Sequence, residues 1–250
     1  MNTTKTMAQY TEKGSKRMLQ LLLTYHKEIL SERLKEKNIE SLYPFPDVNG
    51  VFHEHQLNNK EIMDKLDLNP NDWKCFWPSR QPQWDAILVN KNGNDDFDTV
   101  YLIEAKSHKG EIGGRYLPQN PSDQQIKNRE KIFKSIQTVA KDYGVQIAEE
   151  DEFWLKKYYQ IANRLAFHHK LKELLHDKTV KLIFLNFIND LTWGKQAVKT
   201  EKDWNNKYKK IFTEMGLDIE DTKRQGVFFI QGVIFINDID VSSYNDGHEK

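Results

Sequence analysis

The sequence predicts an α/β fold in which helices flank a mixed central sheet. Three observations favour this class. Apolar residues recur at helical spacing in several long segments, two apolar runs of strand length stand on either side of a turn-rich loop, and a third run is apolar at nearly every position. Helices and strands follow one another in an irregular order, so a series of uniform βαβ units is not expected.

The length and composition of the chain favour one domain. With 250 residues, of which 38% are hydrophobic, the chain is long enough to bury a substantial core. We expect residues 1–12 to form a disordered tail and residues 13–250 to form a single domain. Residues 41–83 are rich in Pro, Asn and Asp, and we expect them to be irregular apart from a short helix near 59–67.

The longer predicted helices share an amphipathic pattern of apolar residues. They are expected at 16–37, 122–142, 150–176 and 201–216. Ser122 is a favourable N-cap for the second of these helices, and Gly216 ends the last one.

The predicted strands are marked by apolar runs and by the turns between them. They are expected at 84–89, 99–105 and 180–188, with one or two more within 226–236. The loop "NKNGNDDFD" contains an Asn-Gly pair and predicts a hairpin of the longer-loop kind between the first two strands. Three glycines within 110–120 predict a mobile loop. The run at 180–188 is typical of a strand buried on both faces.

Composition also bears on cellular class. The 37 basic and 37 acidic residues cancel, so an overall basic signature for nucleic acid is absent, although basic residues outnumber acidic ones between 156 and 210. The single cysteine cannot form an intramolecular disulfide, which fits a reducing compartment. The longest apolar run, 227–236, is too short to span a bilayer, and the first residues do not resemble a signal peptide. We therefore expect a soluble, cytoplasmic protein without a membrane partner.

Three charged residues stand at the ends of the two hairpin strands. Glu104 and Lys106 share one face of the second strand because strand side chains alternate. The start of the first strand lies beside the end of the second in an antiparallel hairpin, so we expect Asp85 to lie near both. The tripeptide alone carries no weight, since acid-x-Lys also occurs at 72–74 and 221–223. Its place at the end of an apolar strand gives it weight.

This set of side chains indicates a particular chemistry. Two neighbouring carboxylates repel each other, and a cation makes the arrangement favourable. Carboxylate oxygens are ligands of hard ions such as Mg²⁺, and a lysine beside them can orient a water molecule or stabilise developing charge. The set therefore indicates metal-assisted hydrolysis of phosphodiesters. The alternative is a structural salt bridge at a strand end, without a metal.

The residues around this set resemble the core of the PD-(D/E)xK nuclease superfamily. The resemblance rests on "QWDAIL" and "VYLIEAKSHKGEI", in which Asp85 and Glu104 match the two acids of the motif and Lys106 matches its lysine. Trp84 stands where the motif has proline, a position that the superfamily varies. The segments "YYQIANRLAFHHKL", "VKLIFLNFIND" and "WNNKY" are similar to a set of bacterial and phage proteins of that superfamily.

The resemblance implies a restriction-endonuclease-like fold with an αβββαβ core, and a nuclease that depends on Mg²⁺ or Mn²⁺ and acts on DNA in preference to RNA. Asp85, Glu104 and the Ala105 carbonyl would bind the metal, and Lys106 would position or activate the attacking water. The resemblance also allows a homodimer, although no segment identifies an interface. The alternative is a nuclease fold with little catalysis that binds nucleic acid or a protein partner.

Further residues are candidates for supporting roles. Members of the superfamily often add an acid from the first helix, and Glu28 and Glu32 share a face of that helix, with Glu32 preferred. His108 and Glu111 follow the second strand and could contact phosphate or a second metal. The alternative for each is an ordinary surface position.

Gln160, Asn163 and Arg164 occupy one face of a predicted helix that is otherwise apolar. The functional interpretation is that they brace the carboxylates or hold phosphate. The alternative is that Arg164 makes a buried structural pair with the sheet.

Overall fold

A five-stranded mixed sheet forms the centre of the protein in a computed structural model that describes residues 10–44, 51–92, 96–114, 121–218 and 233–245. The strands, in spatial order, are β1 (Ile39–Tyr43), β2 (Ala86–Lys91), β3 (Phe97–Lys106), β4 (Thr179–Ile188) and β5 (Val233–Asp240). The first three are antiparallel, β4 is parallel to β3, and β5 is parallel to β4. The predicted class, α/β with a mixed sheet flanked by helices, is confirmed.

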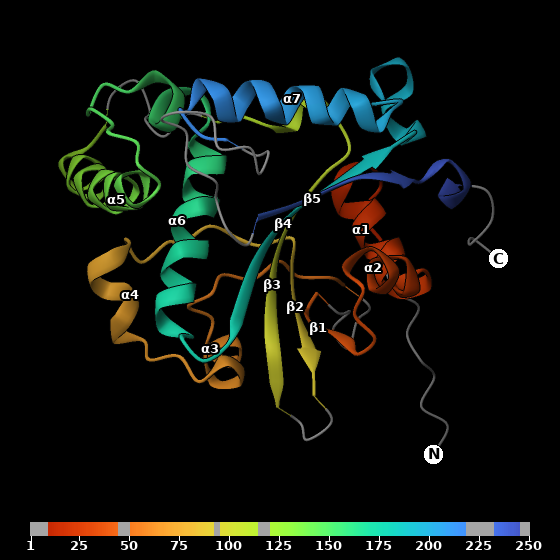
Figure 1. The fold of residues 1–250 in the computed structure, drawn as a ribbon, viewed down its shortest axis with the longest axis horizontal. Coiled ribbons are helices and arrows are strands. Elements are labelled where there is room, and N and C mark those ends of the chain that lie inside the picture. Colours follow the sequence, from red (N-terminus) through yellow and green to blue (C-terminus); the bar gives the residue numbers. More distant parts are fainter. Residues whose placement is uncertain (1–9, 45–50, 93–95, 115–120, 219–232, 246–250) are drawn as a thin grey trace.

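Helices cover both faces of this sheet. They are α1 (Gly14–Tyr25), α2 (Lys27–Leu34), α3 (Lys60–Leu66), α4 (Asn71–Phe76), α5 (Asp123–Asp142), α6 (Tyr159–Leu174) and α7 (Glu201–Glu214). Figure 1 shows α1 and α2 on one side of the sheet, α5 and α6 on the other, and α7 across the top of the view. A helix long and apolar enough to cross a bilayer does not occur in the described ranges.

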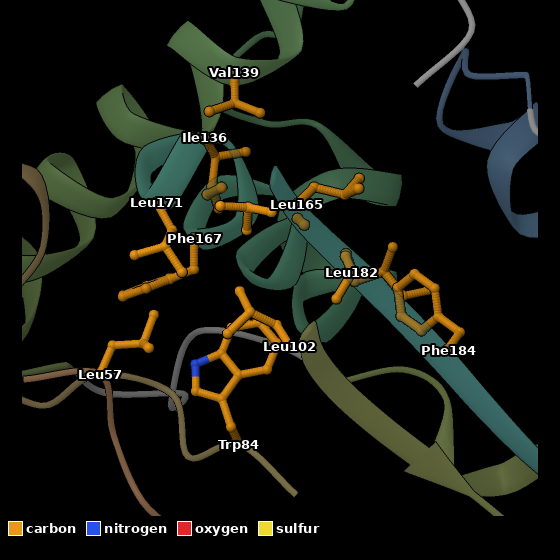
Figure 2. Packing of buried hydrophobic residues seen from close by; sticks show 14 of the residues in the cluster. Leu57, Trp84, Leu102, Ile136, Val139, Leu165, Phe167, Leu171, Leu182 and Phe184 are labelled. Carbon is orange, nitrogen blue, oxygen red and sulfur yellow. The ribbon is translucent and has the colours of Figure 1, made fainter. Parts of the chain in front are cut away.

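β3 lies between two apolar layers because its side chains alternate between the faces of the sheet. Val100 and Leu102 pack in the layer shared with α5, α6 and α7, whereas Tyr101 and Ile103 pack in the layer shared with α1 and α2. Figure 2 shows the first layer, in which Leu102 lies among side chains of the neighbouring helices. β4 is buried on both faces, as its continuous apolar run predicted.

Local sequence signals placed several elements correctly. The hairpin of β2 and β3 is antiparallel as predicted. The short helix expected near 59–67 is α3. Ser122 caps α5 in a reciprocal capping box, in which the Ser122 N–H donates to Gln125 Oε1 at 2.8 Å and the Gln125 N–H donates to Ser122 Oγ.

The helix predicted over 16–37 is two helices, which corrects the prediction. His26 has non-helical angles (φ −136°, ψ 31°) and separates α1 from α2. Its ring stacks on Tyr244 with centroids 4.6 Å apart. The sequence does not reveal this bend, because the apolar spacing continues across it. Leu30 and Leu34 of α2 pack in the same apolar layer as α1.

The helix predicted over 150–176 is also interrupted. A π-helical turn, Glu152–Lys157, precedes α6, and Tyr158 between them is non-helical. Asp151 begins the π-helical turn by accepting hydrogen bonds from the backbone N–H groups of Phe153 and Trp154. This local side-chain cap competes with a regular α-helical start.

Two short elements were not predicted, and three predictions fall partly outside the described residues. β1 and α4 lie in or beside the segment expected to be irregular, and both are too short to show a clear period. Of the expected tail, residues 1–9 lie outside the described ranges, as do residues 115–120 of the glycine-rich loop. The strand expected within 226–236 is described only from Val233, where β5 begins and continues to Asp240.

His168 gives the fold a pH dependence. The side chain is fully buried on α6, its Nε2 lies 3.2 Å from the Val180 carbonyl oxygen, and burial lowers its pKa to about 4. In the unfolded chain the imidazole has its ordinary pKa of 6.5 and binds a proton below that pH, whereas in the folded state it binds one only near pH 4. The folded state therefore loses stability as pH falls from 6.5 to 4. We expect this group to cost about 3 kcal/mol over that range.

The measurement is urea denaturation of wild type and His168→Gln from pH 7 to pH 4. The glutamine keeps a donor for Val180 but has no ionisable group, so the variant should lose less stability as pH falls. Parallel curves for the two proteins would contradict this account of His168.

Candidate functional site at the end of β3

The ends of β2 and β3 place Asp85 opposite Glu104. Ala86 pairs with Ile103, so the next step outward along the ladder sets Asp85 against Glu104. Residues opposite each other in such a ladder share a face, with Cβ atoms about 5 Å apart. Asp85 Oδ2 also accepts a hydrogen bond of 2.7 Å from the Ala105 N–H. Because β2 begins only at Ala86, the Asp85 carboxylate takes the place of the backbone carbonyl that a longer β2 would have offered to the Ala105 N–H.

Glu104 is the buried centre of a charge cluster. It is 2% exposed, and Lys106 Nζ and Arg164 Nε each donate to one of its carboxylate oxygens. Arg164 Nη2 also donates to the Gln83 carbonyl oxygen at 2.7 Å, and the guanidinium carbon lies 4.6 Å from the centre of a Trp84 ring. A buried carboxylate is tolerated when it is paired and hydrogen-bonded, and these two cations meet both conditions.

The pKa values of the cluster follow from this packing. Burial opposes ionisation of Glu104, but the charges of Arg164 and Lys106 hold the pKa of its carboxyl group below the ordinary value. Burial also opposes a charged Lys106, yet Glu104 and Asp85 hold its pKa above the ordinary value. Burial, followed by the charge of Glu104, raises the pKa of Asp85 to about 7. Asp85 is therefore the member of this trio that exchanges a proton near neutral pH.

The oxygen atoms at this rim fit a hard divalent cation in kind. Asp85 and Glu104 supply carboxylates on one face of the sheet. The N–H and C=O groups of one strand residue point to the same side, so the Ala105 carbonyl faces Asp85 as its N–H does. Each carboxylate has lone pairs beyond those used in its present hydrogen bonds.

A small cavity beside Asp85 has room for one occupant. Its volume is about 10 Å³, which suits a single water-sized group. No three His, Cys, Asp or Glu side chains converge on a metal-sized point within the ranges that the structure describes. Asp85 lines this cavity, whereas Glu104 and Ala105 are not part of its lining.

Seven residues that the sequence did not single out also line this cavity, and three of them carry polar contacts of interest. These three are Lys16 and Gln20 of α1, and Glu54. Lys16 Nζ and Glu54 Oε1 form an ion pair of 3.1 Å, and Gln20, which is 2% exposed, accepts a hydrogen bond from the Thr11 N–H. Gln20 interrupts the apolar run "MLQLLL", and that interruption was the available signal. Glu54 lies in a segment without periodicity, where no pattern assigns a side chain to a face.

The loop after β3 holds His108 and Glu111 beside the cluster. Glu111 turns back toward β3, where its Oε1 accepts from Ser107 Oγ at 3.2 Å. His108 Nδ1 accepts from the Gly110 N–H, and its ring stacks on Trp193 with centroids 4.8 Å apart. Both side chains are half-buried and have structural partners in the loop. They lie near the predicted site without joining the buried charges.

The three predicted residues of α6 differ in their surroundings. Arg164 binds Glu104 directly. The Asn163 Oδ1 atom accepts from Arg164 Nη1 at 3.1 Å, so Asn163 supports the guanidinium. Gln160 is half-buried one turn earlier, where its backbone N–H faces the Gly113 carbonyl oxygen at 3.4 Å.

The two acids proposed from the first helix lie away from the cluster. Glu28 and Glu32 are exposed on α2. The buried residues of α2, Leu30 and Leu34, pack in the apolar layer on the face of the sheet opposite to Glu104. The structure therefore does not bring either acid to Asp85 and Glu104.

A buried amide network continues from the cluster into β4, β5 and α7. Lys106 pairs with Asn186 in the parallel ladder, and Asn186 Nδ2 donates to Asn237 Oδ1 at 2.7 Å. Tyr208 donates its hydroxyl to Asn186 Oδ1 at 2.9 Å, and Asn237 Nδ2 donates to Asn205 Oδ1 at 2.6 Å. This network fixes α7 against the same end of the sheet. "WNNKY" contained two of its members, but sequence alone did not show what they bind.

No family model, curated protein or solved structure matches the chain. Its class therefore rests on its own geometry: an α/β protein with a mixed five-stranded sheet and a buried acid–base cluster at the end of the central strand.

Arg164→Ala should destabilise the protein strongly. The change leaves buried Glu104 with one cation and removes the bond to the Gln83 carbonyl, and breaking a buried pair in this way costs about 3–5 kcal/mol. Urea denaturation measures the loss. The matched control is Arg33→Ala, which breaks an exposed pair with Asp238 and should cost at most about 1 kcal/mol. Equal losses in the two variants would show that Glu104 does not depend on Arg164.

Proposed function

We propose that the protein is a metal-dependent nuclease that hydrolyses phosphodiester bonds, in DNA in preference to RNA. One observation carries the proposal: Asp85 and Glu104 oppose each other at the end of two neighbouring strands, with the buried ammonium group of Lys106 beside them. Opposed carboxylates with a raised pKa in one of them are typical of functional sites, and a divalent cation would stabilise both in the charged form.

The order of elements supports membership of the PD-(D/E)xK superfamily. With α2, α3, α4 and α5 set aside as additions, the chain runs through α1, the antiparallel strands β1, β2 and β3, the helix α6, and then β4 beside β3. This reduced order agrees with the αβββαβ core that the sequence resemblance implies. In this proposal Trp84, which replaces the motif's proline, has a local role because Arg164 stacks on its ring.

Each residue of the cluster would have a distinct role. Asp85, Glu104 and the Ala105 carbonyl would hold Mg²⁺ or Mn²⁺, and the ion's contribution is to neutralise phosphate charge and to activate water. Lys106, whose raised pKa keeps it protonated, would donate a hydrogen bond to the attacking water or to a phosphate oxygen. Arg164 would fix the position of the Glu104 carboxylate through its hydrogen bond.

Lysines near the loop after β3 support a phosphate-bearing substrate. Lys207 of α7 is half-buried, and burial followed by the charges of Lys210 and Lys109 lowers its pKa. Lys109 is paired with Asp203 and Lys210 with Glu214, and a phosphate of a polynucleotide backbone would add a partner for Lys207.

A second candidate function is a nuclease fold that binds nucleic acid or a protein partner without cleaving it. The observation that favours it is the occupation of both Glu104 oxygens by Lys106 and Arg164. A metal would have to share Glu104 with these two cations.

The first test is thermal melting with and without Mg²⁺ or Mn²⁺. We expect the ions to raise the melting temperature of wild type and to leave that of Asp85→Asn unchanged, since the asparagine can still accept from Ala105 but has no charge. The rise in wild type should be larger at pH 8 than at pH 6, because below the pKa of about 7 a proton competes with the metal for Asp85. Asp98→Asn, an exposed acid near the other end of β3, is the control and should behave as wild type.

The second test is cleavage of labelled DNA and RNA with Mn²⁺ or Mg²⁺. Asp85→Ala should lower the rate by at least about a hundredfold while the protein remains folded. Lys106→Gln should lower the rate as much, but it also leaves buried Glu104 with one cation and should reduce stability, so its folding is checked by thermal melting. An Asp85→Ala protein that cuts at the wild-type rate would refute the metal assignment. Binding of DNA with no cleavage by wild type in either ion would favour the second candidate function.

A further inference from the structure

A cleft of about 370 Å³ lies next to the charge cluster, lined by α5, the start of α6 and the segment 77–82 that leads from α4 toward β2. The helices that border it are seen in Figure 1. Its volume is within the range of pockets that hold small organic groups. Trp77, Pro82 and Tyr159 are among the residues that line it, although Trp77 is only 2% exposed and packs edge-on against Phe167. The aromatic ring of Tyr159 suits a planar ligand that can stack.

Two buried side-chain amides present hydrogen-bond donors to this cleft. Gln81 is 4% exposed, and its Oε1 atom accepts from the Asn58 N–H at 3.1 Å. Asn163 is 6% exposed, and its Oδ1 atom accepts from Arg164 at 3.1 Å. Both oxygens are thus engaged inside the protein. Within the described residues neither NH₂ group has an acceptor, so both amides offer donors to whatever occupies the cleft.

The position of the cleft relates it to the carboxylates. Asn163 and Arg164 are neighbours on α6, and they are joined by a hydrogen bond. Asn163 lines the cleft, whereas Arg164 binds Glu104. Arg80, an exposed cation, lies on the lining of the cleft. The cleft is therefore connected to Glu104 through Asn163 and Arg164.

We infer that the cleft receives a keto nucleobase, thymine or guanine, of a DNA strand, an inference that rests on the proposed function. The aromatic ring of Tyr159 stacks on the base, as in other single-strand binding sites. The NH₂ groups of Gln81 and Asn163 donate to the carbonyl oxygens of a keto base. Adenine instead sets its own NH₂ donor beside its ring acceptors N1 and N7, and the engaged oxygens of Gln81 and Asn163 do not accept from that donor. Arg80 contributes charge for the neighbouring phosphate.

The test is fluorescence anisotropy with labelled oligo-dT and oligo-dA of equal length, in EDTA and in Ca²⁺, so that cleavage is not required. Wild type should bind oligo-dT about tenfold more tightly than oligo-dA. Gln81→Glu keeps an acceptor for Asn58 and replaces the NH₂ donor with a charged oxygen. This variant should lose about tenfold in affinity for oligo-dT and should lose the preference between the two oligomers.

The control is Gln196→Glu, which makes the same chemical change at an exposed position outside the cleft and should keep the preference. Melting curves show whether each variant folds. Arg80→Ala, a change at an exposed residue, gives an independent reading: it should weaken binding of both oligomers and reduce the salt dependence of binding. Unchanged binding by both Gln81→Glu and Arg80→Ala would overturn the inference.

The same assay separates this inference from the proposed nuclease activity. Asp85→Asn should keep the preference for oligo-dT, because the cleft does not include Asp85. Equal affinity of wild type for the two oligomers would overturn the cleft assignment even if the protein cleaves DNA. Thymidine monophosphate should compete weakly. Competition as strong as that of the oligomer would replace the strand with a free nucleotide as the ligand.

Discussion

The burial of Glu104 between Lys106 and Arg164 is the interaction on which the structure at the end of β3 depends. A carboxylate withdrawn from water needs partners at fixed positions, and here one comes from the same strand and the other from α6. Arg164 in turn reaches the Gln83 carbonyl and the ring of Trp84. A single buried charge therefore ties β3, α6 and the approach to β2 into one arrangement.

The contrast between the two carboxylates follows from this arrangement. Glu104 has two cations and stays ionised, whereas Asp85 has a backbone N–H and the repulsion of Glu104. Environments that separate the pKa values of two neighbouring acids commonly accompany different chemical roles. Asp85 is the group whose charge responds to a proton, and Glu104 is the fixed charge beside it; in the proposed function a metal would compete with that proton.

The sequence predicted those parts of the fold and site that depend on short-range patterns. Strand alternation and the hairpin loop were sufficient to bring Asp85 toward Glu104 and Lys106, because both rules operate over neighbouring residues. Periodicity could not show that α2 packs on the face opposite to Glu104, so Glu32 remained a candidate beside the alternative of an ordinary surface position. The break at His26 was equally hidden. Glu54 and the cleft at 77–82 depend on irregular segments whose positions only tertiary packing determines.

The parallel pairing of β3 with β4 has a consequence for how the site comes into being. α6 belongs to the crossover between these strands, so Arg164 reaches Glu104 only when the crossover docks. A chain that has formed only the antiparallel strands β1 to β3 would hold Glu104 and Lys106 in water, as ordinary solvated charges. Loop closure over the residues between β3 and β4 is slow compared with hairpin formation. We therefore expect the withdrawal of these charges from solvent to come late in folding, when α6 docks and β4 joins β3.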